Sequence, residues 1–151
     1  MTTETIFQLI NLYVLPFWLL MILAPHWRVT HNILRTLLPI VPLAGIYVLL
    51  LGMAIGGKSG GGGLDFSLAG ISRLMADPFG FTVGWAHYLA FDLFVGRWIF
   101  WHAREASERK LPQWLISLTL ALTFMAGPAG LLLYFLCSAH LPNIARKGHA
   151  D

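Results

Sequence analysis

The chain has 151 residues, of which 57% are hydrophobic and 11% are charged. Soluble domains carry about 25% charged residues, so this composition excludes an ordinary soluble domain and predicts an integral membrane protein. The formal charge of +3 does not indicate a nucleic-acid partner, because the basic residues lie mainly between apolar runs, where they flank a bilayer.

Four apolar runs are long enough to be transmembrane helices. A hydrocarbon core of about 30 Å needs about 20 residues of helix, and a single span satisfies its own backbone only as a helix. We therefore predict an all-α fold, a single domain over residues 1–151 that is an integral membrane bundle of four transmembrane helices with a glycine-rich second loop. The spans cover about residues 6–24, 33–55, 81–101 and 114–137.

The first run follows the segment MTTETIF, which lacks the basic region of a signal peptide. We expect a retained span in a multi-pass protein of a bacterial-type inner membrane or a photosynthetic membrane. Its polar residues, Gln8 and Asn11, are available to pair with polar groups of other spans. Prolines inside the runs should kink the helices rather than end them; these are Pro16, Pro39, Pro42 and Pro128.

The second run leads into GMAIGGKS, Gly52 to Ser59, which matches the phosphate-loop pattern G-x-x-x-x-G-K-[ST]. A phosphate loop needs a strand before it and a helix immediately after it. Here an apolar span precedes the motif and four glycines follow it. We therefore expect a coincidence in a glycine-rich linker and no nucleotide site.

The second loop, from Gly56 to about Gly80, should hold little regular structure in its glycine-rich first half. Apolar residues at helical spacing in its second half predict a short amphipathic helix on the membrane surface; these are Leu64, Leu68, Ile71 and Met75. Pairs of glycines four residues apart leave a homo-oligomer open as a further expectation; the pairs are Gly52/Gly56 and Gly80/Gly84.

The third run carries His87, Asp92 and Arg97 at intervals of five residues. A charge at the centre of a span costs about 2.5–3.5 kcal/mol even on the most lenient scale, so it normally faces protein or a cavity and marks a functional site. Asp92 is nearest the centre and is the first candidate catalytic residue, followed by His87 and Arg97. Steps of five residues turn about 140°, so the three cannot share one narrow face, and neighbours should pack this helix on most sides.

Each candidate also has a structural interpretation. Asp92 could pair with an arginine, with Asn11 or with Gln8 and so fix the registry of two helices. Arg97 could be an ion-pair or interface residue. For His87, a functional role and a structural role are equally open.

Residues one and two turns from Asp92 form a candidate wall of a substrate site, in particular Trp85, Tyr88 and Gly96. The fourth run adds Gly127 and Pro128, where proline kinks a helix and glycine allows another helix or a flat ligand to approach. Asn11 completes the set of candidate substrate-binding residues.

The six histidines do not indicate a metal or haem site. A haem held by two histidines needs ligands on facing helices at matching depth, and His87 alone lies well inside a span. We expect no metal site and no cofactor.

Two motifs, DPFGFTVGWAHYLAFDLFVGRW and GPAGLLLYFL, resemble the neoxanthin-synthase-like (abscisic-acid-deficient-four-like) family of small membrane proteins. The resemblance extends from about Asp77 to Cys137. It implies four transmembrane helices and the conversion of the epoxycarotenoid violaxanthin to the allenic neoxanthin, in plants within plastid membranes.

The reaction that the resemblance implies is an isomerisation without net electron transfer. An acid protonates the epoxide oxygen while a base removes a proton from the neighbouring polyene carbon. The resemblance makes Asp92 the candidate acid and His87 the candidate base, or the reverse. A carotenoid that crosses the bilayer has its rings near the interfaces, closer to Arg97 and His102 than to Asp92 unless it is tilted.

Three functions of different classes remain open, one of them a proton or small-solute pathway, which four short spans with one acidic residue would form only in an oligomer. The first is a membrane-embedded carotenoid-modifying isomerase with an acid–base mechanism. The alternative is a non-enzymatic protein that binds a carotenoid or lipid and uses Asp92 only for helix registry. The expected partners are a carotenoid or another polyene lipid and the membrane lipids.

Overall fold

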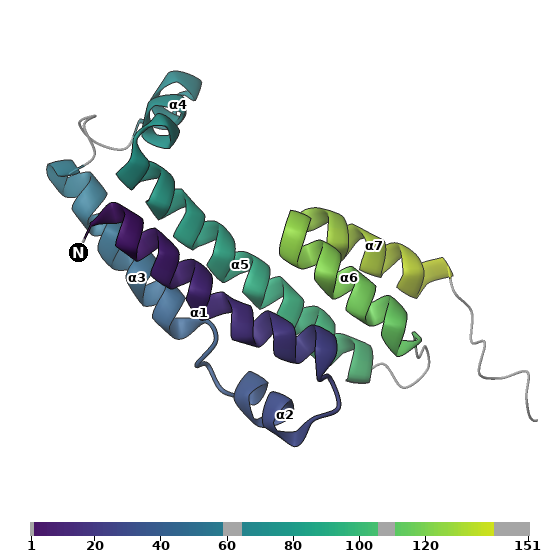
Figure 1. Ribbon diagram of the computed structural model, residues 1–151. Helices are drawn as coiled ribbons and strands as arrows, with labels where there is room; N and C mark the ends of the chain where they lie inside the picture. Colours follow the sequence, from purple (N-terminus) through teal and green to yellow (C-terminus); the bar gives the residue numbers. More distant parts are fainter. Residues whose placement is uncertain (1, 59–64, 106–110, 141–151) are drawn as a thin grey trace, which may run out of the picture. The chain divides into compact units, whose positions relative to one another are not determined.

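All regular structure in the described ranges is helical, which confirms the all-α prediction for them. The computed structural model describes residues 2–58, 65–105 and 111–140. Figure 1 shows the helices along the chain. They are α1 (Thr3–Leu23), α2 (Arg28–Arg35), α3 (Val41–Met53), the short π-helical turn η1 (Ala54–Lys58), α4 (Leu68–Ala76), α5 (Pro78–Glu105), α6 (Gln113–Ala126) and α7 (Pro128–His140).

Helix α1 is the one helix in the described ranges that is both long and apolar enough to cross a bilayer. Its 21 residues rise about 30 Å, and Pro16 lies inside the helix without ending it. Large apolar side chains of α1 are exposed, including Leu12, Leu19 and Leu23, which is typical of a surface that contacts lipid. The helix lengths alone do not confirm a bundle of four spans.

The second apolar run is not one helix. We expected Pro39 and Pro42 to kink a continuous span, and this was wrong, because α2 ends at Arg35 and α3 begins at Val41. Pro42 lies in the first turn of α3. A proline is tolerated there because its missing N–H would have no acceptor within the helix.

The segment after α3 agrees with the absence of a phosphate loop. Helix α3 leads into the motif GMAIGGKS and η1 lies within it, whereas a phosphate loop requires a strand before the motif. Gly57 has a φ of 97°, a backbone conformation that favours glycine. Ser59 lies outside the described residues.

The contacts divide the chain into two compact units. One comprises Met1–Leu15 and Thr36–Phe91, and the other comprises Pro16–Arg35 and Asp92–Asp151. Helices α1 and α5 each contribute residues to both units. His87 therefore belongs to the first unit, whereas Asp92 and Arg97 belong to the second.

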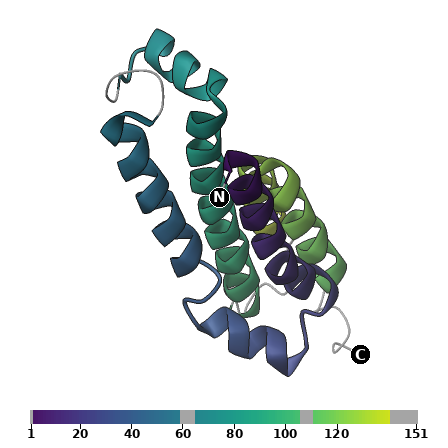
Figure 2. The ribbon, with the colours of Figure 1, turned by 60° about the vertical axis from the view of Figure 1, so that its left-hand side comes forward.

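Helix α4 is the helix predicted in the second half of the second loop. Figure 2 shows α4 set across the start of α5. A Cβ atom at Gly80 would lie 2.2 Å from the Leu74 oxygen, and one at Gly84 would lie 2.7 Å from Met75 Cε. The glycine pair Gly80/Gly84 therefore allows α4 to pack closely on α5, and the expected homo-oligomer stays a prediction.

The apolar side of α4 is exposed, as expected for a helix that lies on a membrane surface. Leu68, Ile71 and Met75 are all exposed, and Leu64 lies outside the described residues. Asp65 holds the start of the helix, since its carboxylate accepts a hydrogen bond from the Ser67 N–H and pairs with Arg73. These contacts, the Ser67 bonds first, hold the pKa of Asp65 below its usual value.

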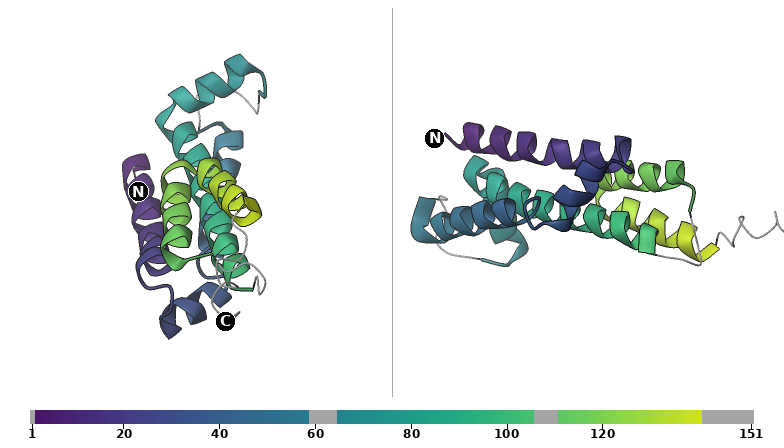
Figure 3. Two further views of the ribbon diagram at one scale, coloured as in Figure 1. Left: turned by 90° about the vertical axis from the view of Figure 1, so that its right-hand side faces the viewer. Right: turned by 90° about the horizontal axis from the view of Figure 1, so that it is seen from below.

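The fourth apolar run folds into a hairpin. We expected Pro128 to kink one continuous helix, and this was wrong, because α6 ends at Ala126 and α7 begins at Pro128. Gly127 between them has φ 24° and ψ −91°, and α7 turns back along α6 (Figure 1 and Figure 3). A Cβ atom at Gly130 would lie 2.2 Å from the Thr123 nitrogen, so glycine also permits the close packing of the two helices.

The hairpin is too short for each of its helices to cross a bilayer. Helix α6 has 14 residues and α7 has 13, so each rises about 20 Å. A hydrocarbon core is about 30 Å thick. The segment that we expected to be the fourth span is therefore a pair of antiparallel half-length helices.

Candidate functional site

Asp92 lies in the second unit, where the side of α5 meets the turn of the hairpin. Its side chain is 7% exposed, and it is the one acidic residue in the described ranges that is buried. A Cβ atom at Gly127 would lie 2.4 Å from Asp92 Oδ1. Only glycine therefore allows the turn to approach this carboxylate, and the structure brings together Asp92 and Gly127 as the sequence suggested.

Two buried threonines of α6 form hydrogen bonds with the backbone of their own helix. Thr119 and Thr123 are both fully buried, and their hydroxyls donate to the carbonyls of Ile116 and Thr119 at 2.8 and 2.7 Å. Pro128 begins α7 directly beside Gly127. The turn of the hairpin thus packs directly against Asp92, and the predicted contribution of Pro128 to substrate binding stays a prediction.

Gly96 has a packing role. We predicted a gap beside it for a substrate, but Trp18 of α1 fills this space, since a Cβ atom at Gly96 would lie 2.4 Å from Trp18 Cη2. The Trp18 ring is 2% exposed and also contacts Phe124 of α6 at a centroid distance of 5.4 Å. Gly96 therefore allows α1, α5 and α6 to pack around one tryptophan.

Arg97 holds the end of α2. Its Nε donates to the Leu34 carbonyl at 2.6 Å, and Trp101 Nε1 donates to the same oxygen at 3.3 Å. Carbonyls in the last turn of a helix have no partner within that helix, so these two donors satisfy a group that burial would otherwise penalise. This contact favours the interface interpretation of Arg97, and its catalytic assignment stays a prediction.

His102 and Tyr134 form a pair that the sequence analysis missed. His102 Nδ1 forms a hydrogen bond of 2.7 Å with the Tyr134 hydroxyl, and Tyr134 is 1% exposed. Trp98 stacks on the imidazole at a centroid distance of 4.6 Å. The spacing of Trp98 and His102, four residues apart on one helix, was a visible signal, but the tyrosine partner depends on the return of α7.

In the first unit, Asn11 of α1 pairs with Trp85 of α5. Trp85 Nε1 donates to Asn11 Oδ1 at 3.0 Å, while Asn11 Nδ2 donates to the Phe7 carbonyl at 2.7 Å. Gln8 donates to Glu4 on its own helix. Asn11 thus sets the registry of α1 and α5 through Trp85, and its predicted role in substrate binding is not tested by these contacts.

Trp85 also lies at the centre of an aromatic ladder, formed by Phe7, Phe81, Trp85 and Tyr88. Trp85 stacks on Phe81 at 5.9 Å and on Tyr88 at 5.4 Å. Phe7 contacts Phe81 and Trp85 at 6.2 and 5.8 Å. The ladder presents stacked ring surfaces of the kind that suit a flat conjugated ligand.

His87 is exposed, in contrast to Asp92. Its ring lies between Tyr47 of α3, at 5.1 Å, and Phe91, at 4.6 Å. From His87 onwards, the exposed residues of α5 recur at helical spacing along one stripe; they are His87, Phe91, Phe94, His102 and Glu105. This confirms that neighbours pack α5 on most sides and that the three candidates His87, Asp92 and Arg97 do not share one face.

Within the part of the chain that the structure describes, no three residues among His, Cys, Asp and Glu gather as metal ligands would. The expectations of no metal and no cofactor stay predictions.

The sequence matches a known family over most of its length. The family model described as ABA4-like, ABA DEFICIENT 4-like, matches residues 5–134. The chain is 25% identical over 149 residues to the protein ABA DEFICIENT 4, chloroplastic, of Arabidopsis thaliana, and the alignment covers 93% of this chain and 63% of the relative. The chain therefore spans less than two thirds of the length of that relative. None of the solved structures matches the chain significantly.

Proposed function

The chain belongs to the ABA DEFICIENT 4-like family, and from this premise we propose that it is a membrane-embedded isomerase that converts an epoxycarotenoid to an allenic carotenoid. The observation that carries the proposal is the contact of Asp92 with Gly127. A buried acid is costly in an apolar helical protein. An acid that lies beside a position where only glycine fits therefore indicates a functional role.

The proposed location is a photosynthetic or bacterial-type inner membrane. The apolar surface of α1 supports it, and so does the chloroplastic location in the name of the Arabidopsis relative. The α6–α7 hairpin, whose exposed residues include Leu118, Leu132 and Phe135, would enter the bilayer without crossing it. Half-length helices are tolerated at membrane depth when they pack on other protein segments.

In the proposed reaction, the acid donates a proton to the epoxide oxygen and the C–O bond to the ring carbon next to the polyene breaks. The base removes the proton from the adjacent polyene carbon, and the electron pair of that C–H bond forms the second of two cumulated double bonds. The oxygen leaves as a hydroxyl group on the same molecule, so atoms and electrons balance. Asp92 carries one of the two proton transfers, as acid or as base, and His87, which lies on another face of α5 in the first unit, stays the sequence-based candidate for the other.

A second candidate function is the non-enzymatic binding of a carotenoid or lipid. The aromatic ladder supports it, because stacked rings hold a polyene without any need for proton transfer. The structural contacts of Asn11, Gly96 and Arg97 are compatible with either function.

The substitution Asp92→Asn separates the two functions. It keeps the size of the side chain and removes the titratable group, so the variant should fold and retain pigment while violaxanthin conversion falls about 10²- to 10⁴-fold. Product analysis by chromatography and detergent melting on one preparation measure both properties. Asp65→Asn is the matched control, since it makes the same chemical change at an exposed carboxylate.

Three outcomes would count against the isomerase with Asp92 as a proton-transfer group. Conversion by the Asn variant at the parental rate would remove Asp92 and leave His87 and the His102–Tyr134 pair as candidates. Pigment binding without conversion by the unmodified protein would favour the binding function. A loss of about 3–5 kcal/mol in the free energy of unfolding would indicate a buried ion pair at Asp92.

A further inference from the structure

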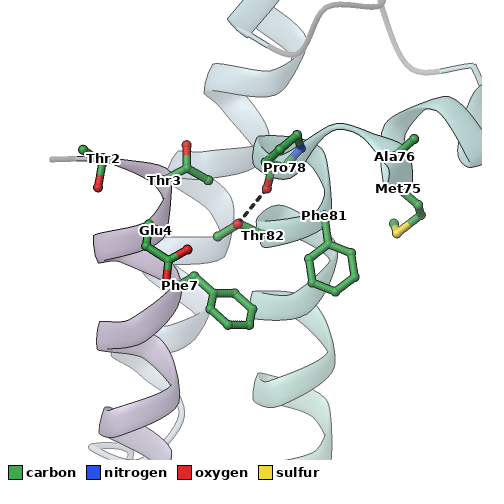
Figure 4. A pocket seen from close by; sticks show the side chains of 9 residues that line it. All are labelled: Thr2, Thr3, Glu4, Phe7, Met75, Ala76, Pro78, Phe81 and Thr82. Atoms are coloured by element: carbon green, nitrogen blue, oxygen red, sulfur yellow. Dashed lines mark hydrogen bonds between the residues drawn. The ribbon is translucent and has the colours of Figure 1, made fainter.

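A pocket of about 590 Å³ opens in the first unit among the start of α1, the last turn of α4 and the first turns of α5. Figure 4 shows its lining side chains, which come from all three segments. They are Thr2, Thr3, Glu4, Phe7, Met75, Ala76, Pro78, Phe81 and Thr82. The volume lies in the range of pockets that bind small organic ligands.

One side of the pocket is apolar and aromatic. Phe7 and Phe81 face one another from α1 and α5, with ring centroids 6.2 Å apart (Figure 4). Met75 and Pro78 extend this apolar lining. Such a surface suits a hydrocarbon ring or chain, and not a strongly hydrated group.

The other side offers acceptors for a hydroxyl group. Among the described residues, Glu4 accepts one hydrogen bond, from Gln8 Nε2 at 2.7 Å, whereas a carboxylate has about four acceptor positions. The Thr82 hydroxyl donates to the Pro78 carbonyl at 2.8 Å, so its oxygen can still accept a hydrogen bond. An O–H group at the end of an apolar ligand would meet both.

The pocket is continuous with the aromatic ladder. Phe7 and Phe81 line the pocket and also contact Trp85, which stacks on Tyr88 further along α5. A conjugated chain lying on Trp85 and Tyr88 would therefore place its end group in the pocket. This continuity selects a long, flat, apolar ligand with a polar end group.

The position of α4 agrees with such a ligand. Leu68 and Ile71 are exposed on α4, so this helix suits the interface between headgroups and acyl chains. Met75 and Ala76, at the end of the same helix, line the pocket. The polar end group of a membrane-soluble polyene resides at this depth.

We propose that this pocket binds the hydroxylated end ring of a xanthophyll, with Glu4 accepting a hydrogen bond from the ring hydroxyl and Phe7 and Phe81 contacting the ring. The choice of a carotenoid rests on the proposed function, whereas the choice of a hydroxylated end group rests on the pocket. A hydroxyl of a lipid headgroup shares this chemistry, so the test includes one.

The test measures binding of zeaxanthin and of β-carotene to the full chain in lipid nanodiscs, by the absorption of retained pigment. The two carotenoids share one hydrocarbon skeleton and differ by the hydroxyl group on each ring. The unmodified protein should bind zeaxanthin about three- to tenfold more tightly, the contribution of one or two hydrogen bonds. Diacylglycerol, added as a competitor, should not displace zeaxanthin.

Two variants test the location. Ala76→Trp places a ring in the pocket from an exposed position and should abolish the preference for zeaxanthin, while Ala69→Trp is the control at an exposed position of the same helix outside the pocket. Glu4→Gln should reduce the preference, while Glu105→Gln, at an exposed site on α5, should leave it unchanged.

Equal binding of the two carotenoids, or a preference that survives Ala76→Trp, would overturn the proposal. Displacement of zeaxanthin by diacylglycerol at equal concentration would overturn the carotenoid as the occupant. Failure of the isomerase would be seen separately, as intact zeaxanthin preference without violaxanthin conversion. If the pocket proposal is wrong and the isomerase proposal is right, the protein will convert violaxanthin in a reaction that depends on Asp92 but will show no preference for zeaxanthin over β-carotene.

Discussion

The Gly127 backbone lies against the Asp92 carboxylate so closely that a single added carbon atom would come within 2.4 Å of Oδ1. The acid on α5 and the turn between α6 and α7 therefore form one structural element of the second unit. The φ of 24° at Gly127 adds a second requirement for glycine at the same position.

Gly127→Ala should disturb both the turn and the acid. The new Cβ atom must displace the carboxylate, and the backbone conformation disfavours a side chain, so we expect a loss of about 1–3 kcal/mol in stability. Detergent melting measures the loss, and carotenoid conversion should fall with it. Gly45→Ala is the control, because a Cβ atom there meets nothing within 4 Å. Equal melting temperatures for the two variants would contradict this account of the turn.

Gly96→Ala should displace the Trp18 ring from its packed position against α5. The Cβ atom would lie 2.4 Å from Cη2 and 2.6 Å from Cζ3 of a rigid ring, and overpacking of this kind costs about 1–3 kcal/mol. Gly52→Ala, at an open position, should cost little.

The double variant Trp18→Phe with Gly96→Ala should recover part of the stability lost in the single glycine variant, because the smaller ring leaves room for the methyl group. We expect a coupling of about 0.5–3 kcal/mol between the two positions in a double-mutant cycle of unfolding free energies. Strict additivity would show that Gly96 and Trp18 do not pack as described.

Trp85→Phe should reveal the registry bond with Asn11. Stacking on Phe81 and Tyr88 is largely kept, but Asn11 Oδ1 loses its donor, which should cost about 1–3 kcal/mol. The same change at Trp114, which is 67% exposed, is the control and should be nearly neutral. If Asn11→Leu removes most of the cost of Trp85→Phe, the pair acts as a unit, and independent effects would refute the bond.

The two ends of the α6–α7 hairpin should lie on the same side of the membrane. Single cysteines at Trp114 and Ala139, both exposed, are placed in a Cys137→Ser background and labelled from one side of oriented vesicles. Both should react from the same side, because neither helix is long enough to cross. Cysteines at Thr5, in the first turn of α1, and at His26, just after its end, should react from opposite sides and serve as the control. Labelling of positions 114 and 139 from opposite sides would show that this segment crosses the membrane as a fourth span.

The sequence alone determined those features that depend on local composition. The apolar runs specify helices because backbone groups that cannot reach water must bond within the segment, and each of the four runs folds mainly into helix in the described ranges, with breaks after Arg35 and at Gly127. The surface helix followed from apolar residues at helical spacing, and Asp92 stood out because a buried charge is costly wherever the helix lies. The family resemblance followed from the motifs on α5 and α7.

The tertiary structure alone decided how the helices meet. Pro128 is compatible with a kink or with the first turn of a new helix, and the positive φ that Gly127 adopts in the packed hairpin selects the second. Pro39 and Pro42 are open to the same two interpretations, and in the structure the second run forms two helices, α2 and α3. Four partners illustrate this: Trp85 for Asn11, Trp18 for Gly96, Leu34 for Arg97 and Tyr134 for His102. The two residues of each pair lie 74, 78, 63 and 32 positions apart in the sequence, respectively. No local pattern encodes such contacts, because they depend on which helix faces fill each other's space.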